Sequence, residues 1–275
     1  MPYRDSSNKI VFANEELENI LDLYLKQKKS VNFISSFYKV NFSVILRVLK
    51  ENKIEIRNSN FYKAKKVDSF FFNEINTEEK AYILGFIYAD GCISNNVLSI
   101  KQKTDDVDIL EKIKFCLKSE HKIINYIENS GYSKNCNVSM LSFKDLQIIK
   151  DLYKYGVIEN KSKILKFPLN IPECLVSHFI RGYFDGDGSV YKIKQNNSIG
   201  ISFVGTNDML SNILLKFQQI CDTNTHIYQY KDKDIFGLTI GGKNNIEKIY
   251  YYLYNDATIF LNRKEEVFKK YFKNA

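Results

Sequence analysis

The chain has 275 residues, of which 44% are hydrophobic and 26% charged, and this composition is typical of a globular protein with one large domain or two smaller ones. It excludes a wholly disordered chain, a collagen-like chain and a small disulfide-stapled protein. The net charge is +8, and residues 1–66 supply most of it, with 13 Lys or Arg against 7 Asp or Glu. Such an excess suits a polyanionic partner.

No apolar run approaches the roughly 20 residues that a membrane helix needs, and the first twelve residues lack the apolar core of a signal peptide. We therefore expect a soluble intracellular protein without a membrane partner, cytoplasmic in a prokaryote or phage host or located in an organelle. The five cysteines are widely spaced and form no Cys-x-x-Cys pair, which predicts free thiols. With only three scattered histidines, carboxylates are the plentiful metal ligands.

Residues 1–57 are predicted to form a small all-α unit. Apolar residues recur with helical spacing over 15–26, Ser30 can cap a second helix, Ser43 can start a third, and residues 53–57 have the pattern of a short strand. The succession resembles a helix-turn-helix module, which implies a third helix in the major groove with Arg47 and Lys50 facing DNA. A three-helix bundle used only for packing is the alternative.

Residues 58–76 are predicted to be a linker. The segment begins Asn-Ser-Asn, carries several lysines and contains the run Phe70-Phe71-Phe72. We expect these phenylalanines to dock on the domain that follows.

From residue 77 onward the chain repeats itself. Residues 81–91 recur as residues 178–188, and each copy is followed by a hairpin pattern, an amphipathic helix, two further strands and a closing helix. The predicted fold is α+β, with two αββαββα repeats at 77–170 and 171–275. Neither repeat can bury its sheet alone, so we expect them to pair as a pseudo-twofold dimer.

The repeated segments predict two buried helices, each ending in Asp-Gly. Glycine costs about 1 kcal/mol relative to alanine inside a helix, so Gly85 and Gly182 are expected at a close contact between the helices. Asp90 and Asp187 then meet at the base of that contact. Two neighbouring carboxylates are tolerable with a cation between them, and oxygen ligands suit Mg²⁺. The alternative is that Asp-Gly only ends the helix and starts a turn.

Residues 83–91 and 180–188 each resemble the signature of the LAGLIDADG homing endonucleases, and the resemblance covers residues 70–275. It implies a monomeric, site-specific endonuclease that cuts both strands of a long double-stranded DNA site, leaving 3′-hydroxyl overhangs, with roles in intron mobility and no small-molecule substrate. It also implies a DNA-binding β-saddle and one active site per aspartate. Mg²⁺ is the expected cofactor, with Mn²⁺ as a substitute and Ca²⁺ binding without cleavage. The implied backbone metal ligands are Ala89, Gly91, Gly186 and Gly188.

One motif position departs from the family pattern. The sixth residue is Tyr88 in the first copy and Asp185 in the second. The eighth residue is the metal-binding one in the family, so activity should survive the departure. Asp185 is expected to be a helix-end cap or a partner of the site rather than a ligand.

Further site residues are implied by the same resemblance. Lys144 and Lys243 follow equivalent strands in the two copies and are candidates for steadying the attacked phosphate. Gln102 is a candidate for positioning water, while the second copy offers Val204 or Gly205 at that place. For each lysine alone, a solvated side chain is nearly as plausible.

The hairpins are expected to read the DNA sequence, because Lys can contact guanine and Asn or Gln can contact adenine. Strand alternation puts Lys101 and Lys103 on one face with Ser99, and Lys192 on one face with Lys194. The turn residues of the predicted interface are Asn95, Asn96, Gln195 and Asn196. The alternative is an ordinary solvated sheet face.

Two other functions stay open on the same scaffold: a catalytically inactive DNA-binding regulator and an RNA-binding intron maturase. An intein is not expected, because the chain starts Met1-Pro2 and ends Lys273-Asn274-Ala275. A calcium loop at residues 185–196 is rejected, because Val190 and Asn196 stand where an EF-hand needs glycine and glutamate.

Overall fold

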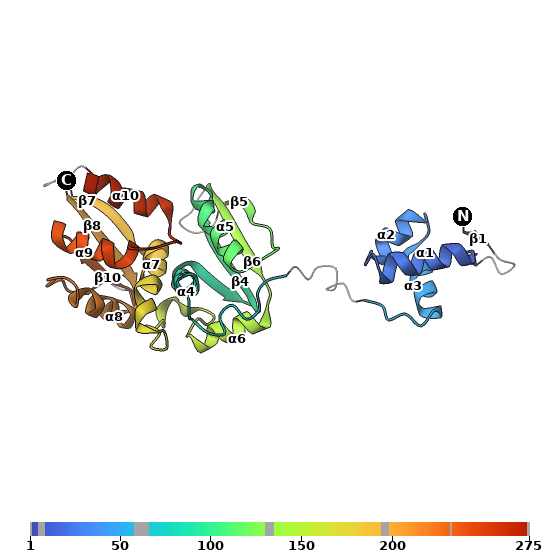
Figure 1. The fold of residues 1–275 in the computed structure, drawn as a ribbon, viewed down its shortest axis with the longest axis horizontal. Helices are drawn as coiled ribbons and strands as arrows, with labels where there is room; N and C mark the ends of the chain where they lie inside the picture. Colours follow the sequence, from blue (N-terminus) through green and yellow to red (C-terminus); the bar gives the residue numbers. More distant parts are fainter. Residues whose placement is uncertain are drawn as a thin grey trace. The chain divides into compact units, whose positions relative to one another are not determined.

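The computed structural model describes residues 2–4, 9–57, 66–129, 135–193, 198–231 and 233–273, and the chain divides into two compact units, residues 1–64 and 65–275 (Figure 1). Among the described helices, none combines the length and hydropathy needed to cross a membrane. The five cysteines are free thiols.

In its described residues, the smaller unit has three helices and a short antiparallel strand pair, so it is not all-α as predicted. Its elements are β1 (Tyr3–Arg4), β2 (Ile10–Val11), α1 (Asn14–Leu25), α2 (Val31–Phe37) and α3 (Phe42–Glu51). Ser30 caps α2 by accepting a hydrogen bond from Phe33 N at 3.1 Å. The cap of α3 is Asn41 rather than Ser43: the helix starts at Phe42, and the Asn41 side-chain oxygen accepts a hydrogen bond from Ser43 N at 3.0 Å.

The strand predicted at residues 53–57 is absent from the described part of this unit. Arg57 instead lies over the ring of Tyr24, 3.7 Å from its centroid, and donates to the carbonyls of Tyr24 and Lys29. The segment that follows α3 is therefore held against α1 by the stacking of Arg57 on Tyr24. Its alternating apolar residues have no neighbouring strand among the described residues with which to pair. The prediction was wrong because alternation alone does not supply a neighbour.

The larger unit consists of two repeats with the same element order. The first contains α4 (Glu78–Asp90), β3 (Gly91–Ser94), β4 (Val97–Lys103), α5 (Val107–Cys116), β5 (Ile124–Glu128), β6 (Cys136–Phe143) and α6 (Leu146–Lys154). The second contains α7 (Val176–Asp187), β7 (Ser189–Ile193), β8 (Ser198–Gly205), α8 (Asn207–Gln218), β9 (Tyr228–Gln229), β10 (Phe236–Ile240) and α9 (Lys243–Tyr254). A further helix, α10 (Asn262–Lys273), was not predicted.

Each repeat forms a four-stranded antiparallel sheet, with strand orders β3-β4-β6-β5 and β7-β8-β10-β9. The two orders are equivalent when the repeats are superposed in sequence. The α+β architecture with two equivalent sheets agrees with the prediction. In Figure 1, α4 and α7 lie beside each other between the sheets. Helix α5 packs on β4 and β6, α8 packs on β8 and β10, and α9 packs on β8 and α7.

Helices α4 and α7 are buried because their sequences are apolar on nearly every side. Thr77 caps α4 by accepting from Lys80 N, and Pro172 opens a short 3₁₀ turn (Glu173–Leu175) that leads into α7. The helices approach backbone to backbone: a Cβ added to Gly85 would lie 2.0 Å from Phe179 O, and one added to Gly182 would lie 2.0 Å from Tyr82 O. This reciprocal contact requires glycine on both sides.

The described end of the segment before α4 belongs to the larger unit. Phe71 and Phe72 are buried in its core, whereas Phe70 is 65% exposed. Two main-chain hydrogen bonds also fasten the segment, from Asp68 N to Leu117 O and from Glu120 N to Lys66 O. Residues 58–65 of the predicted linker lie outside the described residues.

Candidate active site

The ends of α4 and α7 meet at the base of their contact. Asp90 and Asp187 are the last residues of the two helices, and each is followed by an extended glycine: Gly91 starts β3, and Gly188 directly precedes β7. A Cβ added to Gly186 would lie 2.2 Å from Ala89 Cβ and 3.0 Å from Asp90 Oδ2. The Asp90 carboxylate of one repeat thus lies against the backbone of the other.

The two carboxylates have unusual acidities. Burial and, to a smaller extent, the negative charge of Asp187 raise the pKa of Asp90 to about 7, against the opposing effects of a hydrogen bond from Gln102 and the charges of Lys264 and Lys161. Burial also raises the pKa of Asp187, again against the two lysines. Paired carboxylates with raised pKa values are a mark of functional sites.

Gln102 reaches the site from the end of β4. Its Nε2 donates a hydrogen bond to Asp90 Oδ2. The strand register places Gly205 at the corresponding position of β8, and a side chain there would meet the Tyr183 hydroxyl, which donates to Val204 O. The structure therefore brings Gln102 to one carboxylate, and the matching position of the second repeat, Gly205, carries no side-chain amide.

Two buried lysines, which the sequence analysis missed, flank the carboxylates. Lys161 Nζ donates to the carbonyls of Tyr88 (2.7 Å) and Ala89 (3.3 Å) at the end of α4. Lys264 Nζ does the same at the end of α7. Its acceptors are the carbonyls of Phe184, Asp185 and Gly188. Burial lowers the pKa of Lys161, and burial lowers the pKa of Lys264 to about 8.

A sequence signal for these lysines existed in the repeat itself. Each follows the closing helix of its copy, after α6 for Lys161 and after α9 for Lys264. The equivalent segments differ in length and in neighbouring residues, so simple alignment of the two copies does not superpose them.

Lys144 and Lys243, which were predicted instead, lie at the wrong end of the sheets. Gly91 of β3 pairs with Ile100, which pairs with Leu141 of β6, and Lys144 follows three residues later toward the hairpin turn. Three strand residues span about 10 Å. Both lysines are exposed. Both lysines do follow strands, as predicted, but the antiparallel register puts the ends of these strands at the edge of the sheet that is far from the carboxylates.

Asp185 is fully engaged inside the protein. Its carboxylate accepts from the hydroxyls of Tyr82 and Tyr254 at 2.8 Å and from Leu261 N at 2.7 Å. In the first repeat, Tyr88 at the same motif position donates to Tyr155 O. Both residues therefore fasten a motif helix to the chain that leads to a lysine, which agrees with the partner role expected for Asp185.

The outer face of the first sheet carries the predicted β4 residues. Lys101 and Lys103 are exposed and Ser99 half-buried, while the alternate residues face the helices. Lys101 Nζ is also paired with Glu128 at 2.9 Å. Asn95 and Asn96 form the exposed β3–β4 turn with φ of 51° and 59°, where asparagine tolerates the left-handed conformation.

The second sheet differs from the prediction. Lys192 pairs with Ile199 and shares the helix-facing side with Val190, so it does not lie on the outer face. The outer face is occupied instead by Tyr191, whose ring covers Gly200. The alternation was read one residue out of phase, which moves every side chain to the other face. Lys194, Gln195 and Asn196 lie outside the described residues.

In the smaller unit, Lys50 is exposed on α3 but Arg47 is not free to face outward. Its guanidinium donates to Ile10 O and lies 3.7 Å from the Glu51 carboxylate. The β1–β2 strand pair, which was not predicted, binds this arginine through the carbonyl of Ile10. Lys50 thus remains from the predicted pair as an exposed cation on α3.

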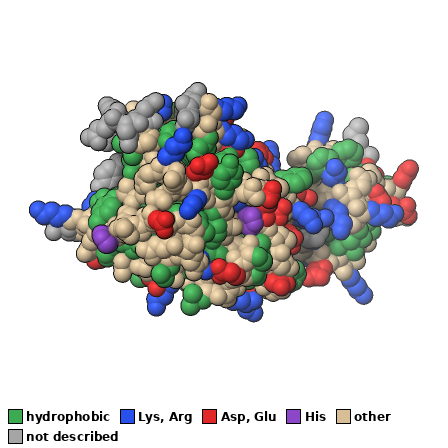
Figure 2. Space-filling view, turned by 60° about the vertical axis from the view of Figure 1, so that its left-hand side comes forward, with side chains coloured by type: hydrophobic (Ala, Val, Ile, Leu, Met, Phe, Trp, Pro, Cys, Tyr) green, Lys and Arg blue, Asp and Glu red, His purple; other side chains and the backbone are tan. Residues whose placement is uncertain are grey.

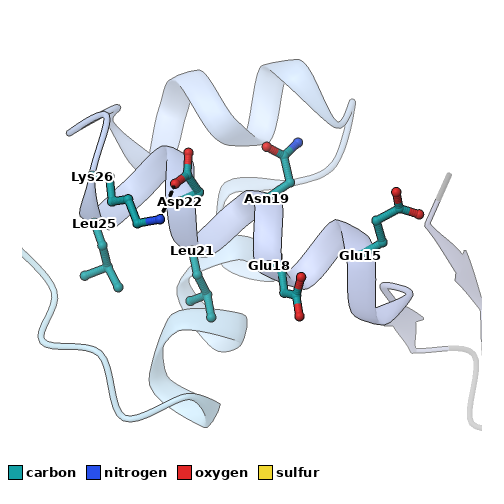
Figure 3. A pocket seen from close by; sticks show the side chains of 7 residues that line it. All are labelled: Glu15, Glu18, Asn19, Leu21, Asp22, Leu25 and Lys26. Carbon is teal, nitrogen blue, oxygen red and sulfur yellow. Dashed lines mark ion pairs between the residues drawn. The ribbon is translucent and has the colours of Figure 1, made fainter.

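The outer face of α1 has a different character. A hollow of about 530 Å³ on this face is lined by acidic and apolar side chains, as Figure 3 shows, with Lys26 paired to Asp22 at 3.1 Å. The acidic residues of this hollow are Glu15, Glu18 and Asp22. Such a face repels phosphate, so any nucleic-acid contact of this unit has to come from another side.

Basic side chains do not gather into one patch on the visible face in Figure 2, where Lys and Arg alternate with acidic and apolar side chains. Within the described residues, no cluster of three or more His, Cys, Asp or Glu could hold a metal ion. A metal at the base of α4 and α7 would therefore take two carboxylates and complete its ligands with carbonyl, water or phosphate oxygens. Such a donor set suits Mg²⁺.

A pH dependence of stability follows from Asp90. Its pKa is higher in the folded chain than in the unfolded chain, so the folded chain holds a proton through the interval from about 4 to 7. Without metal, the wild type should lose stability relative to Asp90→Asn as the pH rises through that interval, by up to about 4 kcal/mol. Urea unfolding of both chains in EDTA from pH 4 to 8 measures the difference. If the wild type becomes more stable relative to Asp90→Asn as the pH rises, the prediction is contradicted.

The second repeat matches a known family. Residues 175–253 match the family model described as LAGLIDADG-like domain, and this range contains α7 with Asp187. The first repeat, with the same sheet order and Asp90 at the same place, is the structural counterpart of that domain.

Particular proteins are similar to parts of the chain. The probable translation initiation factor IF-2 of Methanocaldococcus jannaschii is 33% identical over 186 residues, covering 60% of this chain and 14% of that protein. The DNA-directed RNA polymerase subunit Rpo1C of the same organism is 31% identical over 110 residues, covering 40% and 12%. The chain thus spans only about a seventh or an eighth of these relatives, so their own activities do not transfer to it.

The solved structures that resemble part of this chain include two meganucleases and a homing endonuclease in complex with DNA. Meganuclease I-SmaMI bound to uncleaveable DNA has a TM-score of 0.46 at 12% identity, and I-AabMI bound to uncleaved DNA has 0.46 at 14%. The homing endonuclease I-GzeII in complex with its DNA target has 0.47 at 17%. Each comparison covers 70% of this chain and 88% of the other.

Proposed function

We propose that residues 65–275 form a metal-dependent, site-specific endonuclease that cuts one phosphodiester in each strand of double-stranded DNA. The observation that carries the proposal is the duplicated site: a carboxylate at the end of each motif helix, next to a buried lysine held by that helix end. The match of residues 175–253 to the LAGLIDADG-like domain supports the same reading.

Asp90 and Asp187 are the proposed metal ligands, since burial and mutual repulsion make a cation between them favourable. Ala89 and Gly188 carbonyls already accept from a lysine, and each oxygen keeps a second lone pair for a cation or water. Gly91 and Gly186 backbone oxygens remain proposed ligands. When bound, Mg²⁺ would lower the pKa of a water and polarise the phosphate, with Mn²⁺ as a substitute and Ca²⁺ supporting binding only.

The chain's own residues then supply charge and orientation. Lys161 and Lys264, one at each carboxylate, are the proposed cations that stabilise negative charge developing on the attacked phosphate. Gln102 orients the Asp90 carboxylate and water next to it. A phosphodiester cut on its 3′-oxygen side leaves a 3′-hydroxyl, and two offset cuts give the staggered ends proposed for the product.

DNA is proposed to lie along the outer faces of the two sheets, with Ser99, Lys101 and Lys103 on the first. The turn residues Asn95 and Asn96 extend that surface. The two sheets together would form the saddle of a monomeric pseudo-twofold enzyme. On the second sheet, Tyr191 takes the place proposed earlier for Lys192.

Residues 1–57 are proposed to be an accessory DNA-binding module, with α3 and Lys50 as its contact. Removing residues 1–66 takes away most of the net positive charge, so DNA binding should weaken and the slope of log affinity against log salt should flatten. Titrations of the full and shortened chains at several salt concentrations measure both quantities. If affinity and slope are unchanged, this unit does not contact DNA.

The proposed function is tested by selecting cleaved sites from a randomised duplex library in Mg²⁺, with a Ca²⁺ sample for binding alone. A long unique site that is cut in Mg²⁺ only supports the endonuclease. Binding without cutting in Mg²⁺ and Mn²⁺ overturns it and leaves the DNA-binding regulator, and absence of DNA binding makes an intron RNA the next ligand. No observation in the structure favours either of these over cleavage.

A further inference from the structure

The segment that carries Lys264 is fastened by the other repeat. Arg263 Nε and Nη2 donate to both oxygens of Asp106 at 3.0–3.1 Å, and Lys112 Nζ donates to Phe260 O at 2.9 Å and Asn262 Oδ1 at 2.8 Å. Asp106 precedes α5 directly and Lys112 lies within it, so both belong to the first repeat. The Asp106 carboxylate is 6% exposed, and a buried carboxylate with one bidentate partner holds that partner firmly.

The segment that carries Lys161 is fastened in the opposite direction. Thr206 Oγ1 donates to Leu165 O at 2.6 Å, and Asp208 Oδ2 accepts from Phe167 N at 2.7 Å. Both residues lie at the start of α8, in the second repeat. Leu165 N in turn donates to Lys161 O at 3.0 Å, so one turn of chain joins the anchor to the lysine.

The same relation therefore occurs twice. Residues at or near the start of α5 in the first repeat bind the segment that carries Lys264, and residues at the start of α8 in the second repeat bind the segment that carries Lys161. We propose that Asp106 and Asp208 are positioning residues, which hold Lys264 and Lys161 respectively at the two carboxylates from across the repeat boundary. The proposal rests on the endonuclease function proposed above.

Exact placement matters because lysine has a flexible four-carbon stem. Each Nζ contacts two or three carbonyl oxygens at the end of a motif helix, which requires a fixed backbone for the lysine itself. Misplacement of a catalytic group by about 1 Å can cost about 100-fold in rate. Asp106 reaches Arg263, the residue next to Lys264, and so acts on the lysine through the backbone.

The test follows each DNA strand separately in single-turnover cleavage by the full chain in Mg²⁺. Lys264→Ala and Lys161→Ala first show which strand each lysine serves. Asp106→Ala should then slow the Lys264 strand by about 10- to 100-fold and leave the other strand within about threefold, with DNA affinity in Ca²⁺ unchanged. Asp208→Ala should slow the opposite strand. Glu111→Ala, on α5 but paired with Lys114, is the matched control and should slow neither.

Rescue separates positioning from general damage. The exchanged pair Asp106→Arg with Arg263→Asp should restore the slowed strand, because it remakes the ion pair with reversed polarity. Equal slowing of both strands by Asp106→Ala, or no slowing, overturns the proposal. If Asp106→Ala does not fold, Asp106→Asn keeps the shape and one acceptor, and the same strand comparison applies.

Hydrogen exchange provides a reading that does not depend on cleavage. In Asp106→Ala, exchange should rise over residues 258–268 and stay unchanged over 158–168, and Asp208→Ala should show the reverse. Exchange that rises over both segments or over neither overturns the anchoring. If the two variants show these exchange patterns but the wild type cuts no DNA, the endonuclease is overturned and the anchoring is supported.

Discussion

The chain carrying Asp90→Asn and Asp187→Asn is expected to lose Mg²⁺-dependent cleavage of both strands by at least about a hundredfold while still binding its site. The physical reason is that the two carboxylates lie at the ends of α4 and α7, where each faces the charges of Lys161 and Lys264. Asparagine keeps the shape and removes the charge that a divalent cation needs. Loss of a preorganised electrostatic contribution of this kind costs about 10² to 10³ in rate.

The measurement is single-turnover cleavage of the selected site in Mg²⁺, beside the affinity for that site in Ca²⁺. Folding has its own control, because removing two neighbouring buried charges relieves repulsion, and the melting temperature at pH 8 without metal should rise. Single variants should each slow one strand more than the other, which would appear as nicked product. Undiminished cutting of both strands by the double variant contradicts the assignment of Asp90 and Asp187.

Gly85→Ala and Gly182→Ala are expected to destabilise the larger unit by about 3 kcal/mol or more each. Inside a helix, alanine ordinarily stabilises the fold by about 1 kcal/mol relative to glycine. A loss of stability in these variants therefore reports the steric contact between the two helices. Each new methyl group would lie 2.0 Å from a main-chain carbonyl oxygen of the facing helix. Backbone atoms cannot rotate aside as a side chain can, and the two helices would have to separate.

Urea unfolding of each variant gives the free energy of unfolding. Gly241→Ala is the matched control, because its added Cβ would meet Ile193 Cδ1 at 3.7 Å, an ordinary contact. It should change stability by less than about 1 kcal/mol. If Gly85→Ala is as mild as this control, the motif helices can be pushed apart without loss, and their close approach does not set the spacing of Asp90 and Asp187.

The sequence predicted those features that a local pattern determines. The duplicated apolar helix with Asp-Gly at its end predicts two buried helices and two carboxylates, and the hairpins with their asparagine turns predict the sheets. These inferences need only the period of the sequence and the direction of the chain. Gln102 was a candidate through the family resemblance alone; it lies within β4, which pairs with the strand that starts beside Asp90.

The lysines of the site could not be found in the same way. Lys161 lies in a short 3₁₀ turn and Lys264 in the first turn of α10. The position of both segments depends on contacts with the other repeat, and no periodicity in the sequence encodes such contacts. Lys144 and Lys243 were preferred because they repeat at a strand end, but antiparallel register directs that end away from the site. Arg47 was misjudged for a similar reason, since its partner Ile10 is remote in sequence.

The ion pair between Asp106 and Arg263 joins residues 157 positions apart in the sequence. Glu78, at the start of α4, accepts hydrogen bonds from Thr258, which lies 180 positions downstream. Contacts so distant in sequence close late in folding, after the loop-closure entropy has been overcome. During synthesis, the first motif helix leaves the ribosome long before residues 258–264 exist. A nascent chain therefore holds Asp90 without its completed surroundings, and we expect a newly made molecule to become competent only after its last helix is released.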